Sequence, residues 1–87
     1  MTNIYTYCLF DNDGNFEGVY SSLKYVYRDA LKLSNTGHSD VYMMTPDGWC
    51  APSLKVLRNI LKGKIDIVIL FKTSNGGAKI LKTKLRE

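Results

Sequence analysis

The stretch Ile-Asp-Ile-Val-Ile-Leu-Phe at residues 65–71 decides the fold of this 87-residue sequence. Apolar, mostly β-branched residues fill every position of it but one, so it predicts a strand with two apolar faces. Such a strand is expected inside a sheet. The turn residues at 74–77 then predict a hairpin whose returning strand covers 78–85, and the lysines of that strand suit an exposed edge.

Two related units precede this hairpin, each with two strands joined by a turn that contains Asp-Gly and then a helix with apolar residues at three- and four-residue spacing. The predicted strands cover 4–10, 16–20, 41–45 and 49–51, and the predicted helices cover about 23–34 and 53–63. The order is therefore ββα-ββα-ββ. We predict one α+β domain over residues 1–87, in which an antiparallel or mixed sheet of about five to six strands carries two helices on one face.

The composition is that of an ordinary globular chain, with 45% hydrophobic and 23% charged residues. No apolar run approaches the roughly 20 residues of a membrane-spanning helix, and no basic and apolar leader follows the polar start. We therefore expect a cytoplasmic protein without membrane association, in which Cys8 and Cys50 stay reduced. No cofactor or metal is expected, because neither cysteine belongs to a CxxC pair and the lone histidine, His38, lies in a polar turn.

Catalytic motifs find little support in the sequence. Asp11, Asp13 and Asp47 lie in predicted turns, where their carboxylates bond to the local backbone. Gly76-Gly77 lacks the spacing and the following Lys-Ser or Lys-Thr of a phosphate-binding loop. We predict that the protein acts by binding and is no enzyme.

Charge is unevenly distributed along the chain. Residues 1–50 contain three basic and six acidic side chains, a net charge of −3, whereas residues 51–87 contain nine basic and two acidic ones, a net charge of +7. Such an imbalance attracts anionic partners, because each phosphate that Lys or Arg neutralises releases condensed counterions. Nucleic acid, RNA in particular, is therefore the leading candidate partner.

Basic side chains recur on one face of each predicted helix, at spacings i, i+4, i+8 in the first and i, i+3, i+7 in the second. The last hairpin adds further lysines. The candidate nucleic-acid-binding residues are Lys24, Arg28, Lys32, Lys55, Arg58, Lys62, Lys64, Lys72, Lys79, Lys82, Lys84 and Arg86. The alternative is that these side chains form the solvated outer faces of amphipathic helices and protect an edge strand.

Aromatic residues allow two interpretations. Tyr25 and Trp49 would stack on unpaired bases if exposed; otherwise Tyr25 packs at the surface and Trp49 belongs to the core or to a dimer interface. The strand tyrosines are expected in the core or on a sheet face: Tyr5, Tyr7, Tyr20 and Tyr42. Because the sheet is apolar on both sides and only two helices are available to cover it, we predict a homodimer.

The segment Asp-Asn-Asp-Gly-Asn-Phe-Glu-Gly-Val-Tyr-Ser-Ser at residues 11–22, in a short basic chain, resembles small accessory proteins of large tailed phages. Within that group the chain is similar to the TifA-type inhibitors of ToxIN ribonuclease toxins. The resemblance implies an RNA-binding homodimer that inhibits a host defence toxin in the cytoplasm, with basic residues between 55 and 86 on the RNA. The alternative is a protein-interaction module that covers an acidic or nucleic-acid-binding surface of a host enzyme.

Overall fold

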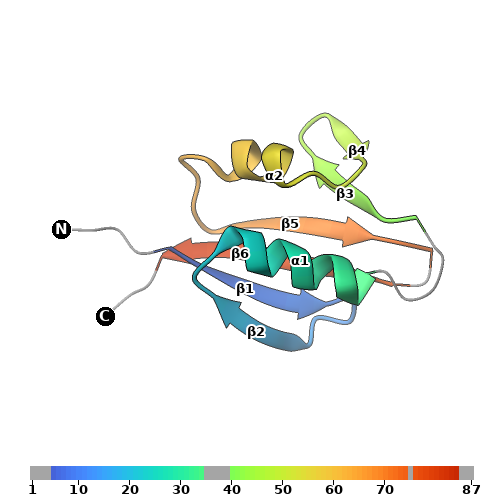
Figure 1. Cartoon of the computed structure of the whole chain (residues 1–87), viewed down its shortest axis with the longest axis horizontal. Coiled ribbons are helices and arrows are strands. Elements are labelled where there is room, and N and C mark those ends of the chain that lie inside the picture. Colours follow the sequence, from blue (N-terminus) through green and yellow to red (C-terminus); the bar gives the residue numbers. More distant parts are fainter. Residues whose placement is uncertain (1–4, 35–39, 75, 85–87) are drawn as a thin grey trace.

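A computed structural model describes residues 5–34, 40–74 and 76–84 as one antiparallel sheet and two helices (Figure 1). The elements are β1 (Tyr5–Asp11), β2 (Phe16–Tyr20), α1 (Leu23–Ser34), β3 (Tyr42–Thr45), β4 (Gly48–Cys50), α2 (Leu54–Leu61), β5 (Ile67–Lys72) and β6 (Gly77–Lys84). The strand order across the sheet is β2-β1-β6-β5-β3-β4. The predicted α+β class and the ββα-ββα-ββ order are confirmed.

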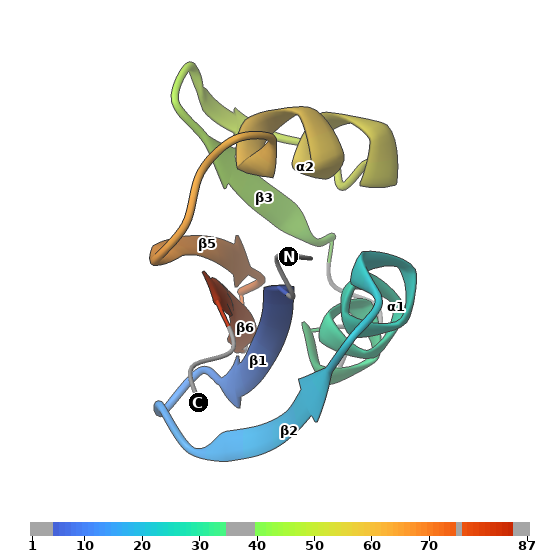
Figure 2. The ribbon, with the colours of Figure 1, turned by 90° about the vertical axis from the view of Figure 1, so that its left-hand side faces the viewer.

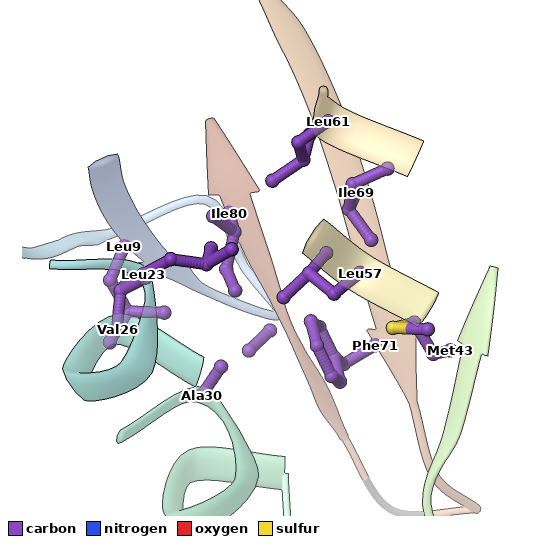
Figure 3. Close-up of a cluster of buried hydrophobic side chains, with 11 residues drawn as sticks. Leu9, Leu23, Val26, Ala30, Met43, Leu57, Leu61, Ile69, Phe71 and Ile80 are labelled. Atoms are coloured by element: carbon purple, nitrogen blue, oxygen red, sulfur yellow. The ribbon is translucent and has the colours of Figure 1, made fainter. Parts of the chain in front are cut away.

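Both helices lie on one face of the sheet (Figure 2). The apolar spacing of α1 turns Leu23, Val26 and Ala30 inward, and that of α2 turns Leu57 and Leu61 inward. These side chains meet the strands in one buried cluster (Figure 3). The strand members of the cluster are Leu9, Met43, Ile69, Phe71, Ala78 and Ile80. We call this side of the sheet the covered face.

Local sequence signals fix the ends of α2. The hydroxyl of Ser53 accepts a hydrogen bond from the backbone N–H of Val56 at 3.3 Å, as expected of a residue that caps a helix N-terminus. Gly63 follows the helix with a φ of 72°, in the left-handed region that glycine adopts without steric cost. The strand predicted from residue 65 instead begins at Ile67, because Asp66 also has left-handed backbone, with a φ of 57°.

The position of β6 corrects a prediction. This strand was expected at an exposed edge, but it is central, because it pairs with β1 along one side and with β5 along the other. The lysines that suggested an edge have two different surroundings: Lys82 points to the covered face and Lys79 to the opposite one. Lysine content was therefore a poor guide to strand position. The edge strands are β2 and β4.

The acidic turn between β1 and β2 holds itself together. The carboxylate of Asp11 accepts hydrogen bonds from the backbone N–H groups of Asp13 at 2.9 Å and Asn15 at 2.8 Å, and from the Asn15 side chain at 3.0 Å. These bonds, led by the one from the Asn15 side chain, lower the pKa of Asp11. The Asp11 carboxylate therefore stabilises the turn, as its position in the sequence predicted.

Candidate nucleic-acid interface

The candidate cations do not form one surface. They separate into three groups and one residue, Arg86, that lies outside the described part of the chain. The first group comes from α2, the loop after it and the end of β6: Lys55, Arg58, Lys62, Lys64, Lys82 and Lys84. The second lies on α1: Lys24, Arg28 and Lys32. The third lies on the sheet face away from the helices: Lys72 and Lys79.

Apart from Lys55, which lies in the first turn of α2, the first group gathers where α2 and β6 end and β1 begins (Figure 1). Lys84 pairs with Tyr5 across the β1–β6 ladder, and the backbone N–H of Lys64 donates to the Leu61 carbonyl at 3.1 Å. Lys62 directly follows the last residue of α2. We call the exposed cations of this region, Arg58, Lys62, Lys64 and Lys84, the cationic end. Three segments that are distant in sequence therefore place like charges at one end of the sheet.

Lys82 is the exception in this group. Its side chain is only 6% exposed, and its ammonium group donates to the Leu61 carbonyl at 2.7 Å and lies 4.5 Å from the centre of the Tyr5 ring. The Leu61 carbonyl thus accepts from both the Lys64 backbone N–H and Lys82, and a cation at the last carbonyls of a helix complements the helix dipole. The prediction that Lys82 contacts nucleic acid is therefore wrong for this structure: burial and its bond to α2 remove it from the solvent.

Arg58 links the cationic end to the aromatic residues of β1. Burial raises the pKa of Tyr7, and the positive charge of Arg58 acts in the opposite direction by favouring the phenolate. On the opposite flank of α2, Ile60 faces a hollow that Met44 and Pro46 also line. The Ile60 flank of α2 accordingly faces the β3–β4 hairpin.

The cations of α1 occupy its outer side and are partly engaged within the protein. The Arg28 Nε atom lies 3.1 Å from a carboxylate oxygen of Asp29, and the guanidinium group lies 4.9 Å from the centre of the Tyr25 ring. Asp29 also accepts a hydrogen bond from the Tyr20 hydroxyl at 2.5 Å. Lys24 and Lys32 are exposed. A carboxylate within this group makes it a weaker anion site than the cationic end.

The remaining cations border the uncovered side of the sheet, which we call the open face. Lys79 stands beside Phe10 on β1 and Leu70 on β5, and Lys72 stands beside Tyr42 on β3. Trp49 is 48% exposed and shares a hollow with Tyr42 and Lys72, which excludes the core position considered for it. Tyr25 is half-exposed as well. This exposure allows Trp49 to stack on a base or to pack against a partner.

Carboxylates lie largely elsewhere. Asp11 and Asp13 belong to the β1–β2 turn, at the far end of β1 from the cationic end. Among the described residues, Asp66 is a carboxylate close to the cationic end, and it accepts a hydrogen bond from the Thr83 hydroxyl at 2.8 Å. Among residues 5–34, 40–74 and 76–84, no three His, Cys, Asp or Glu side chains are grouped in a way that could hold a metal ion. His38 lies outside these ranges.

The sequence did not identify the open face as a continuous surface, although it contained the signal. The residues with side chains on this face in β1, β2, β5 and β6 are Thr6, Cys8, Phe10, Phe16, Val19, Val68, Leu70, Lys72, Lys79, Leu81 and Thr83. This signal is the presence of apolar residues at both odd and even positions of the same strand. It predicts two apolar faces, but it does not say which of them the helices cover.

No helix in the described ranges is long and apolar enough to cross a membrane.

Comparisons with known proteins found no relative of this chain. No protein-family model, no curated protein and no solved structure matches the chain. The resemblance to phage accessory proteins therefore stays a prediction, and the functional argument depends on the residues themselves.

Proposed function

We propose that the protein binds RNA, or another single-stranded nucleic acid, at the cationic end and acts by binding without catalysis. The observation that carries the proposal is the meeting of Arg58 from α2, Lys62 and Lys64 from the residues after it and Lys84 from β6 at one end of the sheet. All four side chains are exposed. The inhibition of a ribonuclease toxin in a host cytoplasm, which the resemblance implies, is part of the same proposal.

The chemistry of the site fits a phosphate backbone. Lys and Arg bind phosphate oxygens by charge-assisted hydrogen bonds, and each phosphate neutralised releases condensed counterions. Tyr5 borders the site and is 38% exposed, so its ring is accessible beside these charges. If about five phosphates are engaged, the logarithm of the binding constant falls with the logarithm of the salt concentration at a slope of roughly −3.5. This corresponds to about a hundredfold loss of affinity between about 50 and 200 mM salt.

A charge-reversal experiment with a matched control tests the proposal. Lys62→Glu combined with Lys64→Glu removes two cations from the cationic end, and Lys32→Glu combined with Lys72→Glu makes the same change in net charge elsewhere. Binding of an unstructured single-stranded RNA is followed by fluorescence anisotropy over a salt series. We expect the first double variant to bind at least about tenfold more weakly, with a slope shallower by about 1 to 1.5. The second should stay within about threefold of the unmodified protein.

Two outcomes reject the site. Equal losses in both double variants would mean that net charge alone, without a localised surface, governs binding. No binding by the unmodified protein at low salt would reject nucleic acid as the partner. A protein purified at low salt without nucleic acid absorbance, in a stoichiometric complex with an acidic host protein, would favour the alternative in which the cationic end covers a nucleic-acid-like surface.

A further inference from the structure

The open face is the largest feature that nucleic-acid binding at the cationic end leaves unused. Paired residues of an antiparallel sheet share a face, so the ladder places one complete row of side chains side by side across four strands. This row consists of Val19, Cys8, Leu81 and Val68. Every member is apolar. We call it the apolar row.

Polar and charged groups flank the apolar row unequally. On one side lies a row that begins with Phe16 and Phe10, whose rings are 5.8 Å apart, and continues with Lys79 and Leu70. On the other side lie the threonines Thr6 and Thr83. The carboxylate that bonds to Thr83, that of Asp66, marks this second side. The open face is thus basic on one side of the apolar row and hydroxylic and acidic on the other.

The helices leave this face uncovered, because the side chains of α1 and α2 that turn inward meet the covered face (Figures 2 and 3). Val19 is 60% exposed and Phe16 59%, and Val68, Tyr42, Met44 and Trp49 are each about half exposed. Aromatic side chains contribute about 150–250 Å² each when fully exposed and Val and Met contribute less, so these six present roughly 500–600 Å² of surface. That is near the upper limit for the largest apolar patch of a monomer, about 300–600 Å².

We propose that the open face packs against the open face of a second copy of this chain, with the two-fold axis along the apolar row. A two-fold axis in this direction reverses the strands, so each copy lays its Lys79 side over the Thr83 and Asp66 side of the other. Lysine thereby meets hydroxyl and carboxylate groups, and like charges stay apart. An axis along the strands would instead lay the Lys79 side of one copy over the Lys79 side of the other, which brings like charges together and costs free energy.

The available area also fits a dimer. A stable interface buries about 800 Å² on each partner. The six half-exposed side chains supply most of this area, and Cys8, Phe10, Leu70 and Leu81 are partly exposed between them. The aliphatic stem of Lys79 can lie along the apolar surface while its ammonium group reaches the rim. Aliphatic side chains dominate the apolar row, and they pack against another sheet better than they stack on bases.

Single valine-to-lysine substitutions test the interface. Val19→Lys and Val68→Lys place a charge in the apolar row, whereas Val56→Lys makes the same change on α2, where Val56 is also exposed. Sedimentation velocity is measured over a micromolar concentration series, on protein treated with nuclease and kept at high salt so that nucleic acid cannot bridge copies. We expect a dimer for the unmodified protein and for Val56→Lys. Val19→Lys and Val68→Lys should self-associate at least about a hundredfold more weakly, because a symmetric interface contains each unpaired charge twice.

The cysteines give a second measurement that needs no variant. Cys8 lies in the apolar row, while Cys50 pairs with Met43 and therefore points to the covered face. On dilution through the association range, alkylation of Cys8 should accelerate severalfold and that of Cys50 should not change. A monomer at all concentrations, a dimer that survives Val68→Lys, or a Cys8 rate independent of concentration would each overturn the proposal. So would an open face occupied by RNA or by another protein in place of a second copy.

This experiment is independent of nucleic-acid binding. The charge reversals at the cationic end change RNA affinity and leave the dimer, whereas the apolar-row variants change the dimer first. Failure of one proposal is therefore distinguishable from failure of the other.

Discussion

The covered and open faces belong to the same strands, so adjacent residues of one strand can be compared in their exposure to solvent. On β5, Ile69 points to the covered face and is 5% exposed, whereas its neighbour Val68 points to the open face and is 48% exposed. On β6, Ile80 is fully buried and Leu81 partly exposed. The composition of the two faces is similar, because both are rich in branched aliphatic side chains. What differs is the presence of helices.

This difference separates two demands on one sequence. The covered face supplies the buried cluster that stabilises the single chain. The open face contributes little to that cluster. Its exposed apolar side chains nevertheless promote aggregation unless another molecule covers them. Apolar residues kept on both faces of β1, β5 and β6 therefore indicate that the second face has a use of its own.

Truncating one phenylalanine on each face should show that the covered face stabilises the single chain far more than the open face does. Phe71 is 2% exposed and its ring lies 6.0 Å from that of Tyr27, so we expect Phe71→Ala to lower the free energy of unfolding by about 3–5 kcal/mol. Phe16 is half-exposed and contacts Phe10, so Phe16→Ala should cost about 1 kcal/mol. Urea denaturation of both variants in the Val68→Lys background excludes any contribution from self-association. Equal losses would show that the open face also stabilises the monomer.

Secondary structure was predictable because it depends on local signals. The spacing of apolar residues in α1, the Ser53 cap of α2 and the Asp-Gly turns are all readable within a few residues. The position of β6 was not, because strand order depends on which segments meet after folding. Lysine is common at edges, and the sequence gives no sign that Lys82 would bond to the end of a helix 21 positions away.

The candidate site was predictable in part for the same reason. Net charge located the basic half of the chain, and helical spacing placed Arg58 and Lys62 on one flank of α2. The separation of the cations into three groups depends on the sheet register, which the sequence leaves undetermined. Lys79 and Lys82 illustrate the difficulty: three residues apart on one strand, they point to opposite faces and have different roles.

Substitution of Lys82 and Lys79 provides a second test of the difference between the covered and open faces. Lys82→Met keeps the aliphatic stem but removes the hydrogen bond to the Leu61 carbonyl and the contact with Tyr5, so we expect a loss of about 1–3 kcal/mol in the free energy of unfolding. Lys79→Met on the open face should change it by less than about 0.5 kcal/mol. Thermal and urea denaturation measure both. An unchanged stability of Lys82→Met would mean that the buried ammonium group costs as much in desolvation as its bonds return.

The smallest expected effect concerns the rim of the covered face and its pH dependence. The Tyr20 hydroxyl donates to Asp29, and this bond, followed by the one from Arg28, lowers the pKa of Asp29 below its ordinary value of about 3.8. A carboxyl whose pKa is lower in the folded state stabilises the fold above the unfolded pKa and loses this contribution as pH falls through the folded value. Tyr20→Phe should therefore unfold with less urea at pH 6, and its difference from the unmodified protein should shrink below about pH 4. Tyr42→Phe, on the open face, should follow the unmodified protein throughout. A constant difference between Tyr20→Phe and the unmodified protein across this range would mean that the hydroxyl acts through packing and that Asp29 is not its energetic partner.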